Sequence, residues 1–183
     1  MMITAALVRQ HLPDQILLEE ISAQYTLDPD DTHGLSHWGR VLENGLLLAD
    51  RLGGDCQVIS LFAIFHDACR ENQHVDHGHG DRGAALAKKI LRDIEIVSKK
   101  QLDQLITACS LHTEGFTKAE LTVQLCWDAD RLDLARAGIM PESRYLCTDA
   151  ARDPAILRWA NLRSLENHTP GYVQEEWRPL FRT

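Results

Sequence analysis

The stretch that decides the fold is residues 57–70, QVISLFAIFHDACR, an apolar run that ends in His66 and Asp67. A helix as hydrophobic as this one is expected at the centre of the molecule. Two ionisable groups at the end of a buried helix are costly unless something compensates their charge. A divalent cation would provide that compensation, so the sequence points to a metal site at this helix end.

The rest of the chain also shows helical rather than strand periodicity, because no alternating apolar and polar run is bounded by turn residues. The sequence therefore predicts an all-α bundle of about six to eight helices, with residues 1–166 as one domain and residues 167–183 as a tail packed on it. Ser36 is a plausible N-cap, and Trp177 and Phe181 are expected to anchor the tail. Helices are predicted over 3–25 with a break near Pro13, 36–52, 57–69, 83–97, 99–111, 121–137 and 142–161 with a break at Pro154.

The composition of the chain argues against several classes of protein. The chain has 183 residues, 44% of them hydrophobic, and a net charge of −8. That charge removes the broad basic surface of a protein that binds nucleic-acid polymers or anionic membranes. The five cysteines are odd in number and form no Cys-x-x-Cys pair, which argues against a disulfide framework or a cysteine zinc site. With no signal-peptide layout or membrane span in the sequence, we expect a soluble cytoplasmic protein, a monomer or a homodimer.

Candidate metal ligands recur from helix to helix. Neutral imidazoles and carboxylates together suit manganese, iron, nickel, cobalt or zinc better than calcium, and magnesium is kept as a further candidate. Asp130 interrupts an apolar stripe of its helix, and Asp128 interrupts another, so spacing alone leaves both open. The remaining candidates from this reading are His37, His66, Asp67 and His112.

The ordered contexts SHWGRV, FHDACR and ADRLD resemble those of the HD superfamily of metal-dependent phosphohydrolases, over about residues 33–137. The resemblance implies an all-helical fold whose motif residues converge on a divalent cation in a central cleft. By position, His37, His66, Asp67 and Asp130 match the motif ligands. Asp128 is then expected behind them, orienting a ligand or pairing with an arginine.

The resemblance also allows a second metal. His79, in HGDRGAALA, and His112, in ACSLHTEG, match the additional ligands of two-metal members, with Asp67 as the bridge. His77 is the nearest alternative to His79, and His33 could line the cleft or serve in its loop. One or two ions are therefore expected.

The implied reaction is attack of a metal-activated water on a small phosphoester, with a nucleotide as the favoured substrate. Glu71, one turn beyond Asp67, is the carboxylate placed by spacing to assist proton transfer. Arginines suit phosphate because their planar fork donates two hydrogen bonds at once, although each could equally be a surface charge or an ion-pair partner. The candidate phosphate-binding residues are Arg40, Arg70, Arg82 and Arg131.

Two alternatives remain open from the sequence. Six protein ligands could hold a diiron pair in an oxygenase of the same fold, and the chain could be a non-catalytic metal- or nucleotide-sensing module. Arg70 stands where the stringent-response hydrolases have the glutamate of His-Asp-x-x-Glu-Asp, and the Gly-Tyr-Pro signature of the cyclic dinucleotide enzymes is lacking. The substrate is therefore left open.

Overall fold

The computed structural model describes residues 3–92, 94 and 96–181, and within these it contains helices and turns but no strand. The expected all-α fold is therefore confirmed. No helix among the described residues is both long and apolar enough to cross a membrane. The α-helices are α1 (Ala5–Gln10), α2 (Gln15–Ser22), α3 (Leu35–Leu52), α4 (Cys56–Phe65), α5 (His79–Leu91), α6 (Lys99–Leu111), α7 (Leu121–Arg131) and α8 (Pro154–Leu165).

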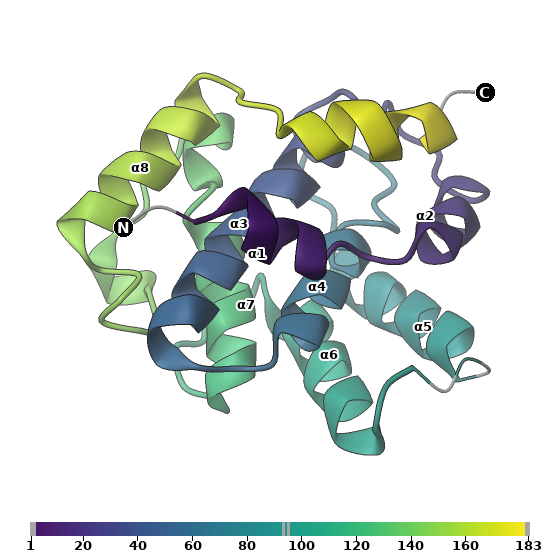
Figure 1. Ribbon diagram of the computed structural model, residues 1–183, viewed down its shortest axis with the longest axis horizontal. Coiled ribbons are helices and arrows are strands. Elements are labelled where there is room, and N and C mark those ends of the chain that lie inside the picture. Colours follow the sequence, from purple (N-terminus) through teal and green to yellow (C-terminus); the bar gives the residue numbers. More distant parts are fainter. Residues whose placement is uncertain (1–2, 93, 95, 182–183) are drawn as a thin grey trace.

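Helices α3 and α4 form the centre of the bundle. Figure 1 shows α3 crossing the middle of the molecule, and it packs against α1, α4, α7 and α8. Every α4 residue from position 58 to 65 is buried, as the apolar run predicts. The α4 N-terminus is fixed by Asp55, whose side chain accepts hydrogen bonds from the Gln57 and Val58 backbone N–H groups. The ionisable residues that follow α4 are thereby held at the core.

Helix α5 begins at His79, four residues before the predicted start, and ends at Leu91 rather than at 97. Residues 93 and 95 of the predicted helix lie outside the described residues. Gly78 is the N-cap, in the left-handed conformation with φ of 83°, which glycine adopts without strain. Helix α3 is likewise capped by Gly34 rather than by Ser36. Because α5 starts early, His79 belongs to a helix and not to a loop.

Two glycines let α5 approach its neighbours closely. A Cβ atom on Gly80 would lie 2.3 Å from the Cys109 carbonyl oxygen on α6. A Cβ atom on Gly83 would lie 2.3 Å from the Phe65 carbonyl oxygen at the end of α4. Any side chain there would push α5 away, so the glycines in HGDRG bring the starts and ends of three helices together.

The helix predicted over 142–161 is wrong in its first half. A short 3₁₀ turn spans Ser143–Tyr145, and α8 begins only at Pro154. Asp153 caps α8 by accepting from the Ala155 backbone N–H, and proline suits the first helical position. The 3₁₀ turn Leu134–Ala137 follows α7 where a continuous helix to 137 was predicted.

The C-terminal segment is folded onto α3. It contains the π-helical turn Val173–Trp177 and the 3₁₀ turn Arg178–Phe181. The Tyr172 hydroxyl donates to the Gly39 carbonyl oxygen of α3, and Trp177 is buried in the core. The segment shields the same helix that carries His37.

Candidate metal centre

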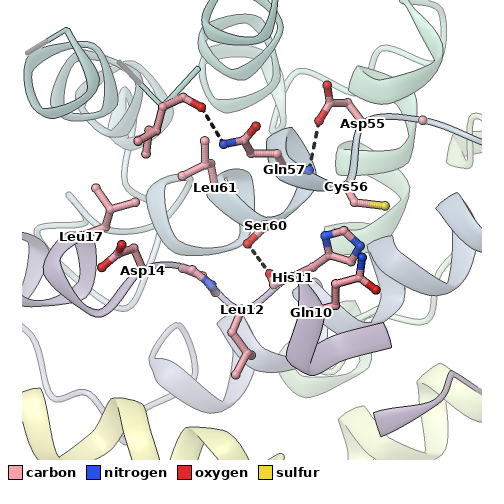
Figure 2. Close-up of a pocket in the computed structure, with 13 residues that line it drawn as sticks. Gln10, His11, Leu12, Asp14, Leu17, Asp55, Cys56, Gln57, Ser60 and Leu61 are labelled. Atoms are coloured by element: carbon pink, nitrogen blue, oxygen red, sulfur yellow. Dashed lines mark hydrogen bonds between the residues drawn. The ribbon is translucent and has the colours of Figure 1, made fainter. Parts of the chain in front are cut away.

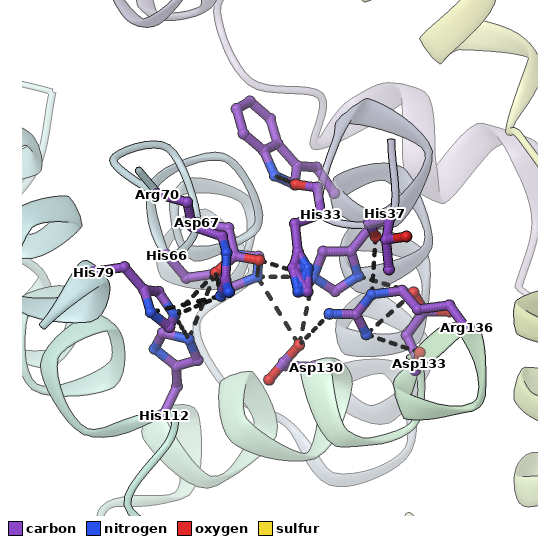
Figure 3. A network of polar contacts seen from close by, with 12 residues as sticks. His33, His37, His66, Asp67, Arg70, His79, His112, Asp130, Asp133 and Arg136 are labelled. Atoms are coloured by element: carbon purple, nitrogen blue, oxygen red, sulfur yellow. Dashed lines mark hydrogen bonds and ion pairs between the residues drawn. The ribbon is translucent and has the colours of Figure 1, made fainter. Parts of the chain in front are cut away.

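Five helices deliver ionisable side chains to one point in the core (Figure 3). Each comes from a helix end or from the residue just beyond it, where side chains of neighbouring helices converge. All are buried or nearly so. These residues are His37 of α3, His66 and Asp67 after α4, His79 of α5, His112 after α6, and Asp130 of α7.

The first group consists of His37, His66, Asp67 and Asp130. The His37 and His66 Nε2 atoms are 3.0 Å apart. His37 Nε2 also lies 3.6 Å from Asp67 Oδ2 and 3.4 Å from Asp130 Oδ1. Atoms bound to one metal at about 2.1 Å are roughly 3.0 to 3.4 Å apart. His37, His66 and Asp67 therefore lie close enough together to hold a single ion, and Asp130 lies at the edge of this group.

The second group consists of His79, His112 and the other oxygen of Asp67. The two histidine Nε2 atoms are 2.9 Å apart. Asp67 Oδ1 lies 3.1 Å from His79 Nε2 and 3.8 Å from His112 Nε2. Asp67 thus turns one carboxylate oxygen toward each group, as a bridging ligand would. Each group contains three buried residues able to hold a metal ion.

The protonation pattern of the histidines tests whether a cation fits the first group. His37 Nδ1 donates to Asp133 Oδ2 at 2.8 Å, and His66 Nδ1 donates to the Phe62 carbonyl oxygen at 3.0 Å. Burial lowers the pKa of both imidazoles, so each is neutral and carries a lone pair on Nε2. Two lone pairs and two carboxylate oxygens then face one another. A divalent cation fits this set of acceptors.

The second group has the same Nδ1 hydrogen bonds, but here burial is outweighed by the hydrogen bond to Asp67 and the nearby carboxylate charges, which raise the pKa of His112. His79 Nδ1 donates to the Asp76 carbonyl oxygen at 2.6 Å, and His112 Nδ1 donates to the Cys109 carbonyl oxygen at 2.7 Å. Both Nε2 atoms again point inward, but Arg70 Nη1 lies 3.2 Å from that of His79. The first group therefore carries the stronger argument for a metal.

Asp133 is a functional residue that the sequence reading missed. Its carboxylate accepts from His37 Nδ1 and also from Arg40, whose Nε lies 2.7 Å from Asp133 Oδ1. A carboxylate behind a metal-binding histidine fixes the ring and its tautomer. The available signal was position, because Asp133 stands three residues after Asp130 in the helix predicted over 121–137, although in the structure it lies just beyond the end of α7.

Arg40 is not placed to bind phosphate, contrary to the expectation. Its guanidinium is buried and donates to both Asp133 oxygens, to Asn167 Oδ1 and to the His168 carbonyl oxygen. These acceptors occupy the N–H groups of the planar guanidinium that would otherwise bind a phosphate. Arg40 therefore holds the Asp133 carboxylate in place, and that carboxylate in turn orients the His37 ring.

Asp128 points away from the metal centre, and its expected place behind the ligands is corrected. It accepts from the Cys147 backbone N–H at 2.6 Å, and from the Thr148 backbone N–H and hydroxyl at 2.9 and 2.7 Å. Burial raises its pKa. Asp128 thus fixes the turn at Cys147 and Thr148, where the predicted 142–161 helix is absent and after which α8 begins only at Pro154.

Asp130→Asn is expected to lose most of the bound metal, whereas Asp128→Asn keeps it. The amide introduced at position 128 would face two backbone donors, which costs on the order of 1–3 kcal/mol of unfolding free energy. Metal content and denaturant unfolding of both variants check this. Loss of metal from Asp128→Asn, with retention in Asp130→Asn, would reverse the assignment.

The other arginines differ in their availability. Arg70 donates to the Asn72 and His74 carbonyl oxygens and reaches the second group. Arg82 is tied to Asp76 by contacts of 2.7 and 2.8 Å. Arg131 donates through Nη1, but its buried Nη2 has no partner among the described residues.

A further arginine, Arg136, was not singled out from the sequence. Its Nη2 lies 3.8 Å from Asp130 Oδ1. Burial would raise the pKa of the Asp130 carboxyl, but Arg136 leads the charges that lower it. Asp130 is therefore ionised and able to bind a cation.

Glu71 does not reach the metal centre, contrary to the expected role in proton transfer. Its side chain is 72% exposed and lies 3.7 Å from Arg82 Nε. His77 is also exposed, so His79 and not His77 joins the cluster.

His33 lies beside His37, with ring centroids 6.3 Å apart, and burial lowers the pKa of His33 to about 4. Its Nδ1 is buried without a described partner.

Two cavities bear on the location of a ligand site. One of about 320 Å³ adjoins the metal centre, because Asp130 and His112 form part of its wall. A larger one of about 660 Å³ lies between the α1–α2 connection and α4 (Figure 2), lined by residues that include His11, Cys56 and Ser60. None of the six candidate metal ligands lines that larger cavity. The smaller cavity is therefore the one connected to the chemistry.

No protein-family model and no curated protein matches the sequence. A crystal structure does match, that of a predicted HD superfamily hydrolase from an uncultured Thermotogales bacterium. The TM-score is 0.66 at 25% sequence identity, and the likeness covers 97% of this chain and 99% of that chain. The all-helical fold and this likeness along nearly the whole length support the HD-domain assignment that the ordered motif implies.

Proposed function

We propose that this protein is a metal-dependent phosphohydrolase that acts on a small phosphoester, with a nucleotide as the favoured substrate. The observation that carries the proposal is the first group, in which two neutral imidazoles and two carboxylates turn only acceptor atoms toward one another. A divalent ion bound there would polarise a phosphoryl oxygen and lower the pKa of a bound water. The likeness to a crystal structure of a predicted hydrolase supports the same broad reaction class.

The chain's own residues would hold and orient the reacting groups. Asp67 presents an oxygen to each group and so fixes their separation. Asp130 lies between the first group and the adjoining cavity, where it could orient a water at the cavity end. Two cations lie beside the first group in place of Arg40: Arg70, 3.5 Å from Asp67 Oδ1, and Arg136, 3.8 Å from Asp130 Oδ1. These placements suit a phosphoryl group at the metal centre and its organic part in the cavity.

The setting of the protein is also proposed. The five cysteines are free in the structure, which suits a reducing compartment such as the cytoplasm. The net charge of −8 favours a small substrate over a nucleic-acid polymer or a membrane surface. We propose that the protein acts as a monomer or a homodimer.

The test is a phosphate-release screen of chelator-treated protein reloaded separately with manganese, iron, nickel, cobalt, zinc or magnesium. Mononucleotides, nucleoside triphosphates and small phosphoesters serve as substrates. We expect turnover of at least one of them by the wild type and by His77→Ala, an exposed histidine control. His66→Ala is expected to lose both metal and turnover, because His66 Nε2 belongs to the first group. The chelated protein should also melt at a lower temperature, since an ion bound only to the folded state stabilises it.

Other outcomes of the same screen would replace the proposal. Two irons per chain with oxygen-dependent turnover would indicate a diiron oxygenase, for which the six ligand candidates around Asp67 suffice. Tight nucleotide binding without hydrolysis under any metal would indicate a sensing module.

A further inference from the structure

The cavity beside the metal centre has walls of two kinds. At one end lie His112 and Asp130, one residue from each side of the metal centre. The rest of the wall is mostly apolar and comes from α7, the turn after it and the segment before α8. Its main apolar members are Leu134, Ile139, Met140, Tyr145 and Leu146. A pocket with an apolar body beside a few polar groups is the usual form of a small-molecule site.

The apolar rim of this cavity is open to solvent. Ile139, Met140 and Tyr145 are all exposed large side chains, and they lie within seven positions of one another. Contiguous exposed apolar surface of this kind commonly marks a ligand groove. Because the rim adjoins the metal centre, a molecule held at the metal through its phosphate could extend across it.

One buried polar group in the wall lacks a partner. Arg131, the residue after Asp130, is more than nine-tenths buried and lines the cavity. Its Nη1 donates to the Tyr145 carbonyl oxygen at 2.7 Å, and its guanidinium lies 5.7 Å from the Trp127 ring centroid. These contacts fix the guanidinium, yet Nη2 is buried with no partner among the described residues. A buried donor left without an acceptor is costly, and an acceptor oxygen brought into the cavity by a ligand would remove that cost.

We propose that this cavity binds the leaving group of the phosphoester, and that Arg131 Nη2 selects leaving groups that carry an acceptor oxygen. This inference rests on the proposed function and narrows its substrate class. The leaving group would have an apolar, aromatic body that fits the wall and one carbonyl or carboxylate oxygen that reaches Arg131. A nucleobase with a carbonyl group fits that description, whereas a simple sugar phosphate, polar on all sides, does not.

The test measures binding of phosphonates, which cannot be hydrolysed. The probes are 3- and 4-carboxybenzylphosphonate, with 3- and 4-methylbenzylphosphonate as matched compounds without the acceptor. Calorimetry with manganese-loaded wild type should show at least one carboxylate probe binding about 10- to 100-fold more tightly than its methyl partner, as a hydrogen bond to a charged group would give. Arg131→Met should remove that preference and leave the methyl probes unchanged.

Two further variants serve as controls. Arg144→Met removes a nearby positive charge whose side chain is 68% exposed and paired with Glu142, so the preference should remain. Leu134→Trp keeps Arg131 but fills the cavity, and it should weaken all four probes while leaving inorganic phosphate binding unchanged. It tests the location even if Arg131→Met loosens the chain at Tyr145.

Equal binding of the carboxylate and methyl probes to the wild type would overturn the inference. So would a preference retained by Arg131→Met, or the absence of binding for all four phosphonates. A failure of the phosphohydrolase proposal alone gives a different result. The protein would then still prefer the carboxylate phosphonates but would release phosphate from none of the esters. Phosphate release without acceptor selectivity would instead retain the hydrolase and reject the leaving-group pocket.

Discussion

Asp67→Asn is expected to empty both metal groups and to reduce phosphate release to background. Asp67 Oδ2 faces His37, and its Oδ1 faces His79 and His112. The amide would offer one weak oxygen and would turn an N–H toward imidazole lone pairs or a cation. The loss of metal affinity should exceed the roughly 10- to 100-fold that is typical of removing a residue behind a ligand. Metal content after gel filtration and phosphate release measure the two effects.

Glu71→Gln is the matched control for this variant. It makes the same chemical change four residues further along the chain, at a side chain that is 72% exposed. Metal content and turnover should stay within about twofold of wild type, as for an ordinary surface substitution. An Asp67→Asn protein with a full complement of metal would refute the bridging assignment, and a Glu71→Gln protein without turnover would restore the proton-transfer role.

Asp133→Ala is expected to damage both stability and metal binding. It leaves the buried Arg40 guanidinium without its two closest carboxylate contacts, and an uncompensated buried charge costs roughly 3–5 kcal/mol of unfolding free energy. It also removes the acceptor of His37 Nδ1, so metal affinity should fall about 10- to 100-fold. Urea unfolding of the metal-free protein and metal titration measure the two losses separately.

The double variant Arg40→Met, Asp133→Ala distinguishes these two roles. Replacing both partners should recover part of the stability, because no unpaired charge remains, but it should not recover metal affinity. Asp149→Ala is the control, since Asp149 pairs with Arg152 at 2.7 Å on the surface and such pairs contribute about 0–1 kcal/mol. Full metal affinity in the double variant would show that Asp133 acts only on the fold.

The sequence predicts the parts of the fold that local chemistry determines. The apolar run before His66 identifies the central helix, and the periodicity of α3 and α6 places both helices within a few residues of the structure, whereas α7 begins where predicted but ends six residues early, at Arg131. The predicted helix over 142–161 fails because Asp128, from a distant helix, captures the Cys147 and Thr148 backbone N–H groups. Such a tertiary contact leaves no periodic signal in the sequence.

The same division holds for the candidate site. Six residues that the sequence singled out lie together, because each stands at a helix end or breaks an apolar stripe. The supporting residues could not be identified in this way. Asp133 was not singled out and Arg40 was expected to bind phosphate, because only the fold brings the two together across 93 positions. The free donor of Arg131 is likewise visible only once the acceptors of the other arginines are known.

The reach of Arg40 has a consequence for the order of events during synthesis. Its guanidinium joins α3 to Asp133 and also to Asn167 and His168, which lie 127 and 128 positions after Arg40 in the sequence. Contacts this distant in sequence form late, after the loop-closure entropy between them has been overcome. A chain still emerging from the ribosome therefore lacks the acceptors that hold Arg40, Asp133 and His37 in line. We therefore expect a metal held through His37 to reach its full affinity only after Asn167 and His168 have folded onto α3.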